Sequence, residues 1–418
     1  MRRFHALTLV AMLGVACRDA TRPIVPVADN VAAAPADTTV AFAWVPLETR
    51  GANFLSSARA VNNQLQAVGW ASVDEVPPCT PGVPCPPARS HAALWQDGVM
   101  QDLGTLGGAS SEATEVNARG QVVGWSDAAD GGVHGFLWER GTLQDLGPIE
   151  RYTLTSPYSF GWYAANINDV GQVVGNRPGG GPFLWENGVS QALPLDFVTD
   201  INNRGDVVGW VLRADTAGVL KRRAALWRDG AVIELGTLGG DESWATAIGN
   251  NGWVSGTSQT EPRPFMGGMS RLRLPFRWRG GAIEGLANCG INASACPVEP
   301  FVSAEGWVVV LDAFSRWSSV WNGAAWRRLS PSSPGPATAL AMNGAGVISG
   351  VRGSFGFGPG FVWQDGVFYD LNSPVSASSW GRDINEAGVV VGHTGPLSRP
   401  QAAKWLPVGT GSGMAVVP

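Results

Sequence analysis

Apolar residues along this chain fall into short runs that are separated by glycine-centred turns. In the segment 91–125, the runs predict four strands: His91–Trp95, Val99–Leu103, Thr114–Asn117 and Gln121–Trp125. The segment Gly104–Ser111 is rich in glycine and predicts a loop. Asn-x-x-Gly and Trp-x-x-Gly place glycine where a short hairpin needs a left-handed residue, because glycine has no Cβ to clash there. The pattern is typical of strands joined by tight turns.

These strands are apolar on both faces. Val122 and Val123 are adjacent, so their side chains point to opposite sides of a strand, and the run from Phe136 to Trp138 behaves in the same way. A strand that is apolar on both sides has to be covered on both sides. Glycine and asparagine interrupt every window long enough for an amphipathic helix, so helical repeats are not predicted.

The pattern recurs about every 45 residues from about residue 41 to 406, which is the period of propeller repeats. Hairpins with the pattern Asn-x-x-Gly-x-Val-Val-Gly, or a degraded form of it, occupy 61–69, 116–124, 167–175, 201–209, 248–256, 302–310, 342–350 and 384–392. Strands that carry a tryptophan alternate with these hairpins and end in Trp44, Trp95, Trp138, Trp185, Trp227, Trp278, Trp321, Trp363 and Trp405. Four antiparallel strands per unit, each sheet packed between two others, predict an all-β β-propeller.

The hairpin count predicts about eight four-stranded blades within residues 41–408. Seven blades are the alternative if the poor unit at 287–326 is an insertion, and a linear β-solenoid is a further alternative. The segments Ala41–Leu47 and Ala402–Val408 share a Trp-x-Pro pattern. We therefore expect strands from the two ends to meet in one composite blade, which removes the open edge of the ring.

A tryptophan that recurs once per unit at the same strand position predicts a packing role between blades. Other tryptophans fall outside that register and are better candidates for ligand binding, although packing is the stronger interpretation for them too. They are Trp70, Trp125, Trp162, Trp210, Trp244, Trp253, Trp307, Trp317, Trp326 and Trp380. Trp70, Trp125 and Trp210 each follow the closing glycine of a hairpin, which predicts a stacked row of their own.

The N-terminus predicts export. Arg2 and Arg3 precede an apolar stretch that is too short to span a bilayer and is typical of a signal peptide. The segment 13–17 (LGVAC) resembles the end of a bacterial lipoprotein signal, with Cys17 as the acylated residue, although Gly14 departs from that pattern. Ordinary secretion is the alternative. Residues 18–40 predict a flexible tether, and residues 409–418 a tail. Arg18 favours an outer-membrane or cell-surface location.

The other four cysteines form two close pairs, Cys79 with Cys85 and Cys289 with Cys296. An oxidising compartment favours disulfides, and one lipid site plus two bridges leaves no thiol over. The alternative is metal ligation. The spacings within the pairs are longer than those of zinc sites, and no histidine lies beside either pair.

The composition and charge of the chain argue against some classes of ligand. Charged residues are 15 % of the chain, whereas glycine (56) and tryptophan (19) are abundant, as expected for tight turns between covered strands. The net charge is −5, and loss of Arg2 and Arg3 with the signal makes it −7. This mildly acidic balance offers no footprint for nucleic acid and no polybasic patch for lipid. We expect membrane contact only through the lipid anchor, a monomer, and no cofactor.

Several motifs resemble the extracellular HAF-repeat family of bacteria, namely HGFLW (134–138), DLGTLGG (102–108) and INDVGQVVG (167–175). The resemblance covers nearly all of 41–408 and is weakest at 287–326. The histidine of the family motif is present only as His91 and His134. The resemblance implies export and a repeat fold, and it implies no established enzymatic activity.

No catalytic, phosphate-binding or calcium-binding motif is recognised in the chain. His91 and His134 hold equivalent places, which favours packing or a surface hydrogen bond, and His393 stands apart. The best local hint of chemistry is a set of close arginines, Arg271, Arg273, Arg277 and Arg279, whose alternate spacing favours a solvated strand face. The sequence thus predicts a binding or scaffold module for a glycan or protein at the envelope. The alternatives are a propeller lyase or hydrolase acting on extracellular polysaccharide, and a subunit of a larger envelope machine.

Overall fold

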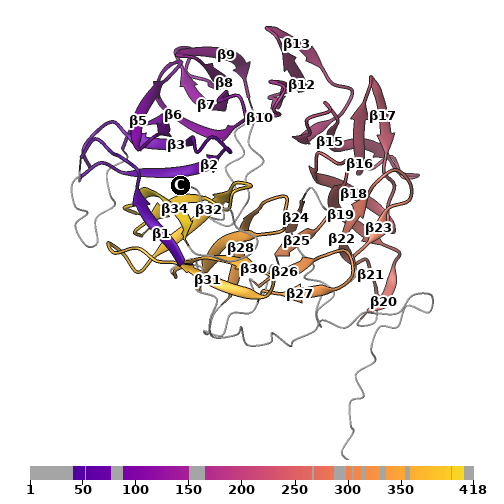
Figure 1. Cartoon of the computed structure of the whole chain (residues 1–418). Coiled ribbons are helices and arrows are strands. Elements are labelled where there is room, and N and C mark those ends of the chain that lie inside the picture. The colour runs from indigo at the N-terminus through magenta and orange to yellow at the C-terminus, as the bar shows by residue number, and fades with distance from the viewer. Residues whose placement is uncertain are drawn as a thin grey trace, which may run out of the picture.

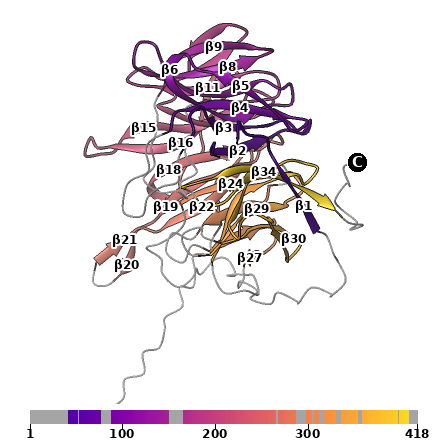
Figure 2. The same cartoon turned by 90° about the vertical axis from the view of Figure 1, so that its left-hand side faces the viewer.

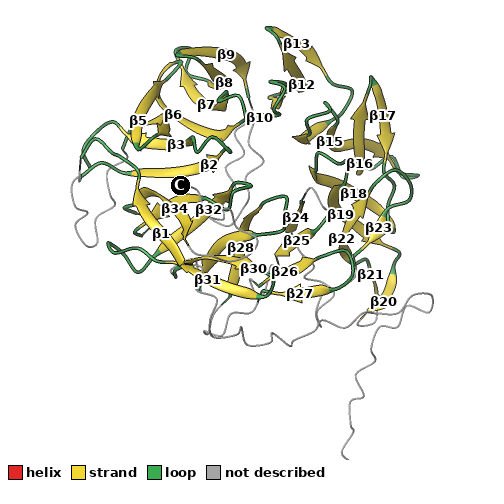
Figure 3. Ribbon diagram, viewed as in Figure 1, coloured by secondary structure: helices red, strands yellow, loops and turns green. Residues whose placement is uncertain are grey.

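The computed structural model describes residues 41–51, 53–76, 88–149, 165–265, 268–286, 298–303, 306–311, 317–329, 336–353, 358–396 and 398–408. The leader, the tether, the tail and all five cysteines lie outside these ranges. Every regular element within them is a β-strand (Figure 3). No helix in the described ranges is long and apolar enough to cross a membrane.

Eight sheets of four antiparallel strands follow one another around a ring (Figure 1). Blade 1 consists of β2 (Ser56–Val61), β3 (Ala67–Ser72), β4 (Ser90–Gln96) and β5 (Val99–Gly104), and blade 2 of β6 (Gly107–Val116), β7 (Val122–Ala128), β8 (Val133–Glu139) and β9 (Thr142–Pro148). Blade 3 consists of β10 (Ala165–Ile167), β11 (Val173–Arg177), β12 (Gly181–Glu186) and β13 (Val189–Ala192), and blade 4 of β14 (Phe197–Ile201), β15 (Val207–Ala214), β16 (Leu220–Arg228) and β17 (Ala231–Glu234).

Blade 5 consists of β18 (Gly239–Ile248), β19 (Val254–Thr260), β22 (Arg273–Trp278) and β23 (Glu284–Gly285), and blade 6 of β24 (Val298–Val302), β25 (Val308–Leu311), β26 (Ser318–Trp321) and β27 (Trp326–Arg328). Blade 7 consists of β28 (Ala337–Met342), β29 (Ile348–Arg352), β30 (Gly360–Gln364) and β31 (Val367–Leu371), and blade 8 of β32 (Ser379–Ile384), β33 (Val390–Thr394), β34 (Gln401–Val408) and β1 (Ala41–Pro46). A separate hairpin of β20 (Arg263–Phe265) and β21 (Gly268–Ser270) stands away from the ring in Figure 2.

Strands from the two ends of the described chain close the ring. β1 pairs with β34 as the outermost strand of blade 8, and Trp44 lies opposite Trp405. Figure 1 shows β1, in indigo, against β34, in yellow. The predicted closure by Ala41–Leu47 and Ala402–Val408 is confirmed. Trp44 lies on an outer strand, whereas the other eight repeat tryptophans lie on third strands, which explains why nine tryptophan strands serve eight blades.

The blades are offset from the repeat unit read in the sequence. The unit 91–125 supplies the last two strands of blade 1 and the first two of blade 2. Each blade therefore begins with the strand that leads into an asparagine hairpin. The weak segment 287–326 also contributes to a full four-stranded blade, β24 to β27, so the count is eight. Neither the seven-blade alternative nor the solenoid agrees with the structure.

Apolar clusters fill the spaces between successive blades. Trp95 packs with Val391 and Ala402 between blades 1 and 8, and Trp405 belongs to the cluster between blades 7 and 8. Their indoles are 1 % and 0 % exposed. Trp227 is only partly buried, at the edge of its cluster. The predicted interblade role of the repeat tryptophans is confirmed, with unequal burial from blade to blade.

The glycine-rich segment 104–111 is not the loop that the sequence predicts, because β6 already begins at Gly107. The backbone of Gly107 has a left-handed φ of 96°. Gly108 packs so closely on β7 that a Cβ there would lie 2.5 Å from the Cβ of Asp127. Glycine is required at both places for the strand to approach its neighbour.

The asparagine hairpins owe their shape to the side chain of their first residue. Oδ1 of Asn117 accepts the backbone N–H groups of Arg119 and Gln121, at 2.9 and 3.0 Å, and Nδ2 donates to Oε1 of Gln121 at 2.7 Å. The turn glycine, Gly120, has a positive φ of 75°. The motif Asn-x-x-Gly-Gln is thus one hydrogen-bonded unit, in which the asparagine side chain bonds to the backbone two residues on, as is common at turns.

The same asparagines also join neighbouring blades. Nδ2 of Asn117 donates to the backbone oxygen of Asn168 in blade 3 at 2.9 Å, and Asn385 donates across the closure to the backbone oxygen of Asn62 at 3.0 Å. Equivalent bonds start from Asn62, Asn168, Asn202 and Asn343. A buried belt of side-chain amides therefore ties the hairpins at six of the eight blade junctions, and it is interrupted at blades 5 and 6, where Gly249 and Ser303 replace the asparagine.

Candidate functional site

The antiparallel topology gives the ring two unlike faces. The connections from first to second strand and from third to fourth strand lie on one face of the ring. Each of them contains five residues or fewer, apart from blade 8, where the third and fourth strands come from opposite ends of the chain. Connections from second to third strand and from blade to blade open on the other, and they range from 105–106 to 73–89. We call these the short-turn face and the loop-bearing face. Variation in loop length gathers on the second, which makes it the candidate ligand site.

The two segments with predicted disulfides are placed only by the order of the strands along the chain. The segment 77–87 lies between β3 and β4, and 287–297 lies between β23 and β24. Cys79, Cys85, Cys289 and Cys296 are outside the described residues, as is Cys17. The two bridges and the lipid site stay predictions.

The off-register tryptophans are largely covered. Trp162 is outside the described residues. The buried ones are Trp210, Trp244, Trp326 and Trp380, and the half-buried ones are Trp70, Trp125, Trp253, Trp307 and Trp317. Packing is therefore the correct interpretation for most of this set. Arginine side chains lie over Trp253 and Trp380, but Trp210 and Trp244 differ from the rest of this set because one arginine, Arg222, lies over both.

We call Phe197, Trp210, Arg222, Trp244 and Arg273 the Arg–Trp cluster. Phe197 and Trp210 stack with ring centroids 4.3 Å apart and planes 5° apart. The guanidinium carbon of Arg222 lies 4.8 Å from the ring centroid of Trp244 and 5.7 Å from that of Trp210. That of Arg273 lies 5.4 Å from the centroid of Trp244. The cluster thus places two cations on one aromatic base.

The strands of blades 4 and 5 position this cluster. Phe197 opens β14 and is the register partner of Trp210 in β15, and Arg222 follows on β16. Trp244 lies in β18, and Arg273 opens β22. Phe197, Arg222 and Arg273 lie at or near the ends of their strands that adjoin the loop-bearing face, whereas Trp210 and Trp244 lie in the middle of theirs. Strand order therefore brings together side chains from five strands that sequence reasoning did not connect.

The four close arginines of the sequence are divided between the two faces. Arg271 forms an ion pair with Asp241 at 2.9 Å on the loop-bearing side, where Arg273 also lies. Arg277 and Arg279 lie over the ring of Trp253, at 4.8 and 5.6 Å, on the short-turn side. β22 crosses the blade from one face to the other, so residues at its two ends cannot form one site. The four arginines therefore do not form one catalytic cluster.

His91 and His134 each join two neighbouring strands of one blade through a hydrogen bond to an aspartate. Nδ1 of His91 lies 3.0 Å from the carboxylate of Asp102, and Nδ1 of His134 lies 2.9 Å from that of Asp145. Burial alone would lower the pKa of His134, but the hydrogen bond and charge of Asp145, with help from Asp130, raise it above its ordinary value. In each of these two sheets, the histidine of the third strand therefore bonds to the aspartate of the fourth. This agrees with the predicted structural role of His91 and His134.

A third histidine belongs to a polar cluster near the ring axis that the sequence did not reveal. His393 is 1 % exposed, and its Nδ1 lies 3.1 Å from Oγ of Ser57 across the closure. Its ring stacks on Trp380. Burial, then the charges of Arg382 and Arg59, hold the pKa of His393 well below its usual range. The imidazole is therefore neutral at physiological pH.

Two acidic groups flank that cluster. Arg59 forms an ion pair with Glu112 of the next blade, and their side chains are 23 % and 13 % exposed, so solvent reaches them. Asp383 accepts the backbone N–H of Val61 at 2.8 Å, and burial raises its pKa. This axial cluster joins blades 8, 1 and 2.

Glu115 and Asp200 hold places equivalent to that of Asp383. Each accepts a backbone N–H from the following blade, Ile167 at 2.9 Å and Ile248 at 2.8 Å. Burial raises the pKa of Glu115 to about 8 and that of Asp200 to about 7. Such carboxyls often mark functional sites. Here their hydrogen bonds to neighbouring inner strands indicate a role in blade docking.

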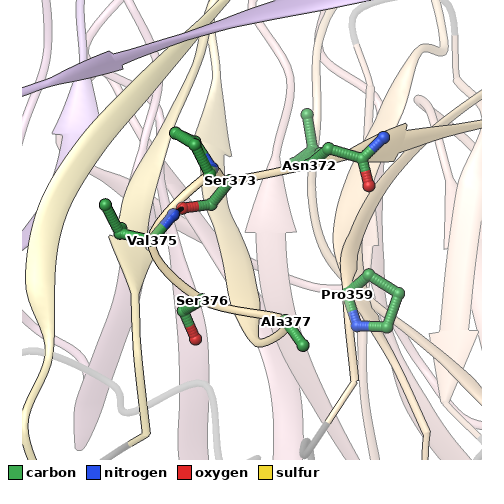
Figure 4. Close-up of a pocket in the computed structure, with 8 residues that line it drawn as sticks. Pro359, Asn372, Ser373, Val375, Ser376 and Ala377 are labelled. Atoms are coloured by element: carbon green, nitrogen blue, oxygen red, sulfur yellow. Dashed lines mark hydrogen bonds between the residues drawn. The ribbon is translucent and has the colours of Figure 1, made fainter.

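A cavity of about 440 Å³ lies on the loop-bearing side between blades 7 and 8. Figure 4 shows residues 372–377 as one loop, with Pro359 across from Ala377. The lining residues carry no ionisable side chain, so the cavity offers shape and hydroxyl groups but no acid or base. Within the described ranges, no group of three or more His, Cys, Asp and Glu side chains is arranged to hold a metal ion.

No family model and no curated protein matches the sequence, so the resemblance to the HAF-repeat family stays a prediction. Solved structures with a similar fold include the β-propeller domain of the trilobed protease from Pyrococcus furiosus, with 11 % identity, a TM-score of 0.47, and coverage of 77 % of this chain and 99 % of that one. Virginiamycin B lyase from Staphylococcus aureus is similar at 10 % identity and a TM-score of 0.42, with coverage of 87 % and 99 %. YCF48 bound to D1 peptide is similar at 11 % and 0.40, with coverage of 88 % and 97 %.

Proposed function

We propose that this protein is an exported, lipid-anchored binding module of the bacterial cell envelope, with its ligand, a glycan or a protein, on the loop-bearing face. The supporting observation is the contrast between the two faces. One end of the ring has uniform short turns tied by a belt of amides, and the other carries every long connection. A rigid frame with variable loops on one side suits recognition.

The closure of the ring indicates at which face the predicted lipid anchor would join the protein. Ala41 opens β1 opposite Val408, the last residue of β34, and this end of both strands belongs to the short-turn face. A tether over 18–40 would therefore join the ring at the rim of that face. With a lipid on Cys17, the attachment to the membrane would leave from the short-turn side, so the tether would not cross the loop-bearing face.

A glycan array probed with the purified full chain tests the binding function. We expect retention on a restricted set of envelope or matrix glycans. Release of new reducing ends or unsaturated products from a polysaccharide would overturn the proposal in favour of catalysis. No retention on any glycan, together with no binding to immobilised envelope proteins, would also contradict it.

The lipid anchor has its own test. Mass spectrometry of the protein from a bacterial membrane fraction should find an acylated N-terminal peptide beginning at Cys17. The Cys17→Ser variant should move to the soluble exported fraction. An unmodified peptide that begins beyond Cys17 would favour ordinary secretion.

A lyase or hydrolase is the alternative function, and the axial cluster favours it most. Arg59 and Glu112 form an ion pair that is partly exposed to solvent, and the charge of Arg59 acts on His393. Under this alternative, Glu112→Gln would abolish turnover of a polysaccharide while leaving the fold intact. The nearly complete burial of the His393 ring argues against direct contact with a substrate.

A further inference from the structure

We infer that the Arg–Trp cluster binds an acidic polysaccharide, with the guanidinium groups of Arg222 and Arg273 taking carboxylates of its uronic-acid residues. This inference rests on the proposed binding function, because it names the ligand class and the place on the loop-bearing face. It concerns blades 4 and 5, away from both the axial cluster and the cavity between blades 7 and 8.

The indoles hold both guanidiniums in place before a ligand arrives. Arg222 and Arg273 lie 4.8 and 5.4 Å from the ring centroid of Trp244, where the negative face of the ring attracts a cation. A stacked guanidinium keeps its N–H donors at its edge, and that edge matches the two oxygens of a carboxylate. Because the side chains are already ordered, less rotamer entropy is lost on binding.

The positive charge of these arginines is weakly compensated. Arg222 meets only the edge of the ion-pair range with Glu242, at 4.0 Å, and Glu242 also accepts a hydrogen bond from Gln259 at 3.0 Å. Arg273 forms no ion pair with a carboxylate in the described ranges. By contrast, Arg228 is held by a buried carboxylate at 2.6 Å. The two stacked arginines therefore keep their charge for a ligand.

The chemistry favours a polymer of acidic sugars over an isolated anion. Two cations share one indole, so an extended chain with repeated carboxylates can engage both at once, which raises avidity. Trp210 and Trp244 are themselves buried, at 8 % and 9 % exposure, so they serve as the base under the arginines and the guanidinium groups make the contact with the ligand. The chain as a whole carries a net charge of −5, so a polyanion gains no general attraction and needs such a local site.

The test uses the full chain and isothermal titration calorimetry at fixed salt. The probe is an oligogalacturonate, and the matched control probe is the same oligomer as its methyl ester, which has no charge. We expect the acid to bind and the ester to bind at least about tenfold more weakly, because each lost charged hydrogen bond costs about that factor. Dextran sulfate distinguishes carboxylate recognition from general attraction to polyanions.

Two variants locate the site. Arg273→Met keeps an apolar side chain over Trp244 and should weaken binding by about tenfold, and Arg222→Met with Arg273→Met should abolish it. Arg279→Met is the control, because Arg279 also stacks on an indole, that of Trp253, at 5.6 Å but on the opposite face. It should bind as the unaltered protein does. Circular dichroism melting checks that each variant folds.

Each outcome has a distinct meaning. Equal binding of the acid and the ester, or a loss with Arg279→Met that equals the loss with Arg273→Met, overturns the inference. Binding of a neutral glycan or a protein ligand that ignores both arginines also overturns it, while the proposed binding function stands. Turnover of the oligogalacturonate would instead sink the proposed function.

Discussion

Single residues differ in how much each copy of the repeat depends on them. Trp405 is fully buried, and its Nε1 donates to the backbone oxygen of Asn372 at 2.9 Å. Trp227 holds the same strand position in blade 4 but is only partly buried. The same residue type at the same place in the motif therefore stabilises the ring to different degrees.

Replacing each of these two tryptophans tests whether burial, and not position in the repeat, decides how much the residue stabilises the fold. Trp405→Ala should lower the free energy of unfolding by about 3–5 kcal/mol, because it empties a large dry site and leaves an acceptor unpaired. Trp227→Ala should cost clearly less. Urea unfolding followed by far-ultraviolet circular dichroism gives both values, and equal losses would show that burial does not decide the outcome.

Glu115 should make stability depend on pH. Its folded-state pKa is raised from 4.5 to about 8, so the folded protein keeps a proton that the unfolded chain releases. Its contribution is complete below pH 4.5 and is lost as the pH rises through 8. At about 1.4 kcal/mol per pKa unit, the loss is at most roughly 5 kcal/mol, and less because the side chain is only half-buried.

Glu115→Gln keeps an oxygen to accept the N–H of Ile167 and removes the titration. Thermal unfolding of the variant between pH 5 and 9 should show a flatter profile than that of the unaltered protein. His393 acts in the opposite sense: its pKa is lowered, so its contribution is lost as the pH falls below 6.5. An identical alkaline slope in both proteins would exclude Glu115 as the cause.

At the scale of elements, the hairpin is the part that the sequence describes best. Asn, Gly and Gln recur at fixed positions because their bonds are local, within one turn. The bond from Asn385 to the backbone of Asn62 joins residues at opposite ends of the chain. No local pattern reveals such a partner, and the belt of amides therefore emerges only from the closed ring.

Asn385→Ser tests the belt with a substitution that the chain itself uses. Ser303 occupies the equivalent place, and its Oγ accepts the N–H of Trp307 at 3.3 Å, but it has no amide to donate to the next blade. Asn385→Ser should keep the turn and lose the bond to Asn62. The expected cost is about 1–3 kcal/mol, measured by chemical denaturation. A loss below about 0.5 kcal/mol would show that the interblade bond adds little.

The candidate site was predictable in kind but not in place. The sequence singled out Trp210 and Trp244 as off-register and Arg273 as one of four close arginines. It could not bring Arg222 to them, because that contact depends on the packing of blade 4 against blade 5. It also grouped Arg279 with Arg273, since spacing along a strand does not tell which end of a sheet faces a ligand. Long-range order decides both points.

At the scale of the whole molecule, the ring depends on one pairing between its ends. β1 supplies the outer strand of blade 8 and covers β34 along its length. Phe42 belongs to the cluster that contains Trp405. Without β1, the edge of β34 and part of this cluster would be open to solvent.

Deleting residues 41–47 should therefore weaken the whole propeller. We expect a lower melting temperature and self-association, because an open edge strand is a template for pairing with another chain. The matched control is deletion of residues 18–40, which should leave the melting temperature unchanged. Differential scanning calorimetry and size-exclusion chromatography measure both effects, and an unchanged monomer after deletion of 41–47 would contradict this role for β1.

The pairing of β1 with β34 also sets an order of events during synthesis. β1 is translated first of all the strands and its partner last, so the first strand has to wait for nearly the entire polypeptide before it finds its place. Contacts between such distant parts of a chain are slow to form. A polypeptide whose translation stops early can build some blades yet never lock them, which leaves a fragment suited to proteolysis.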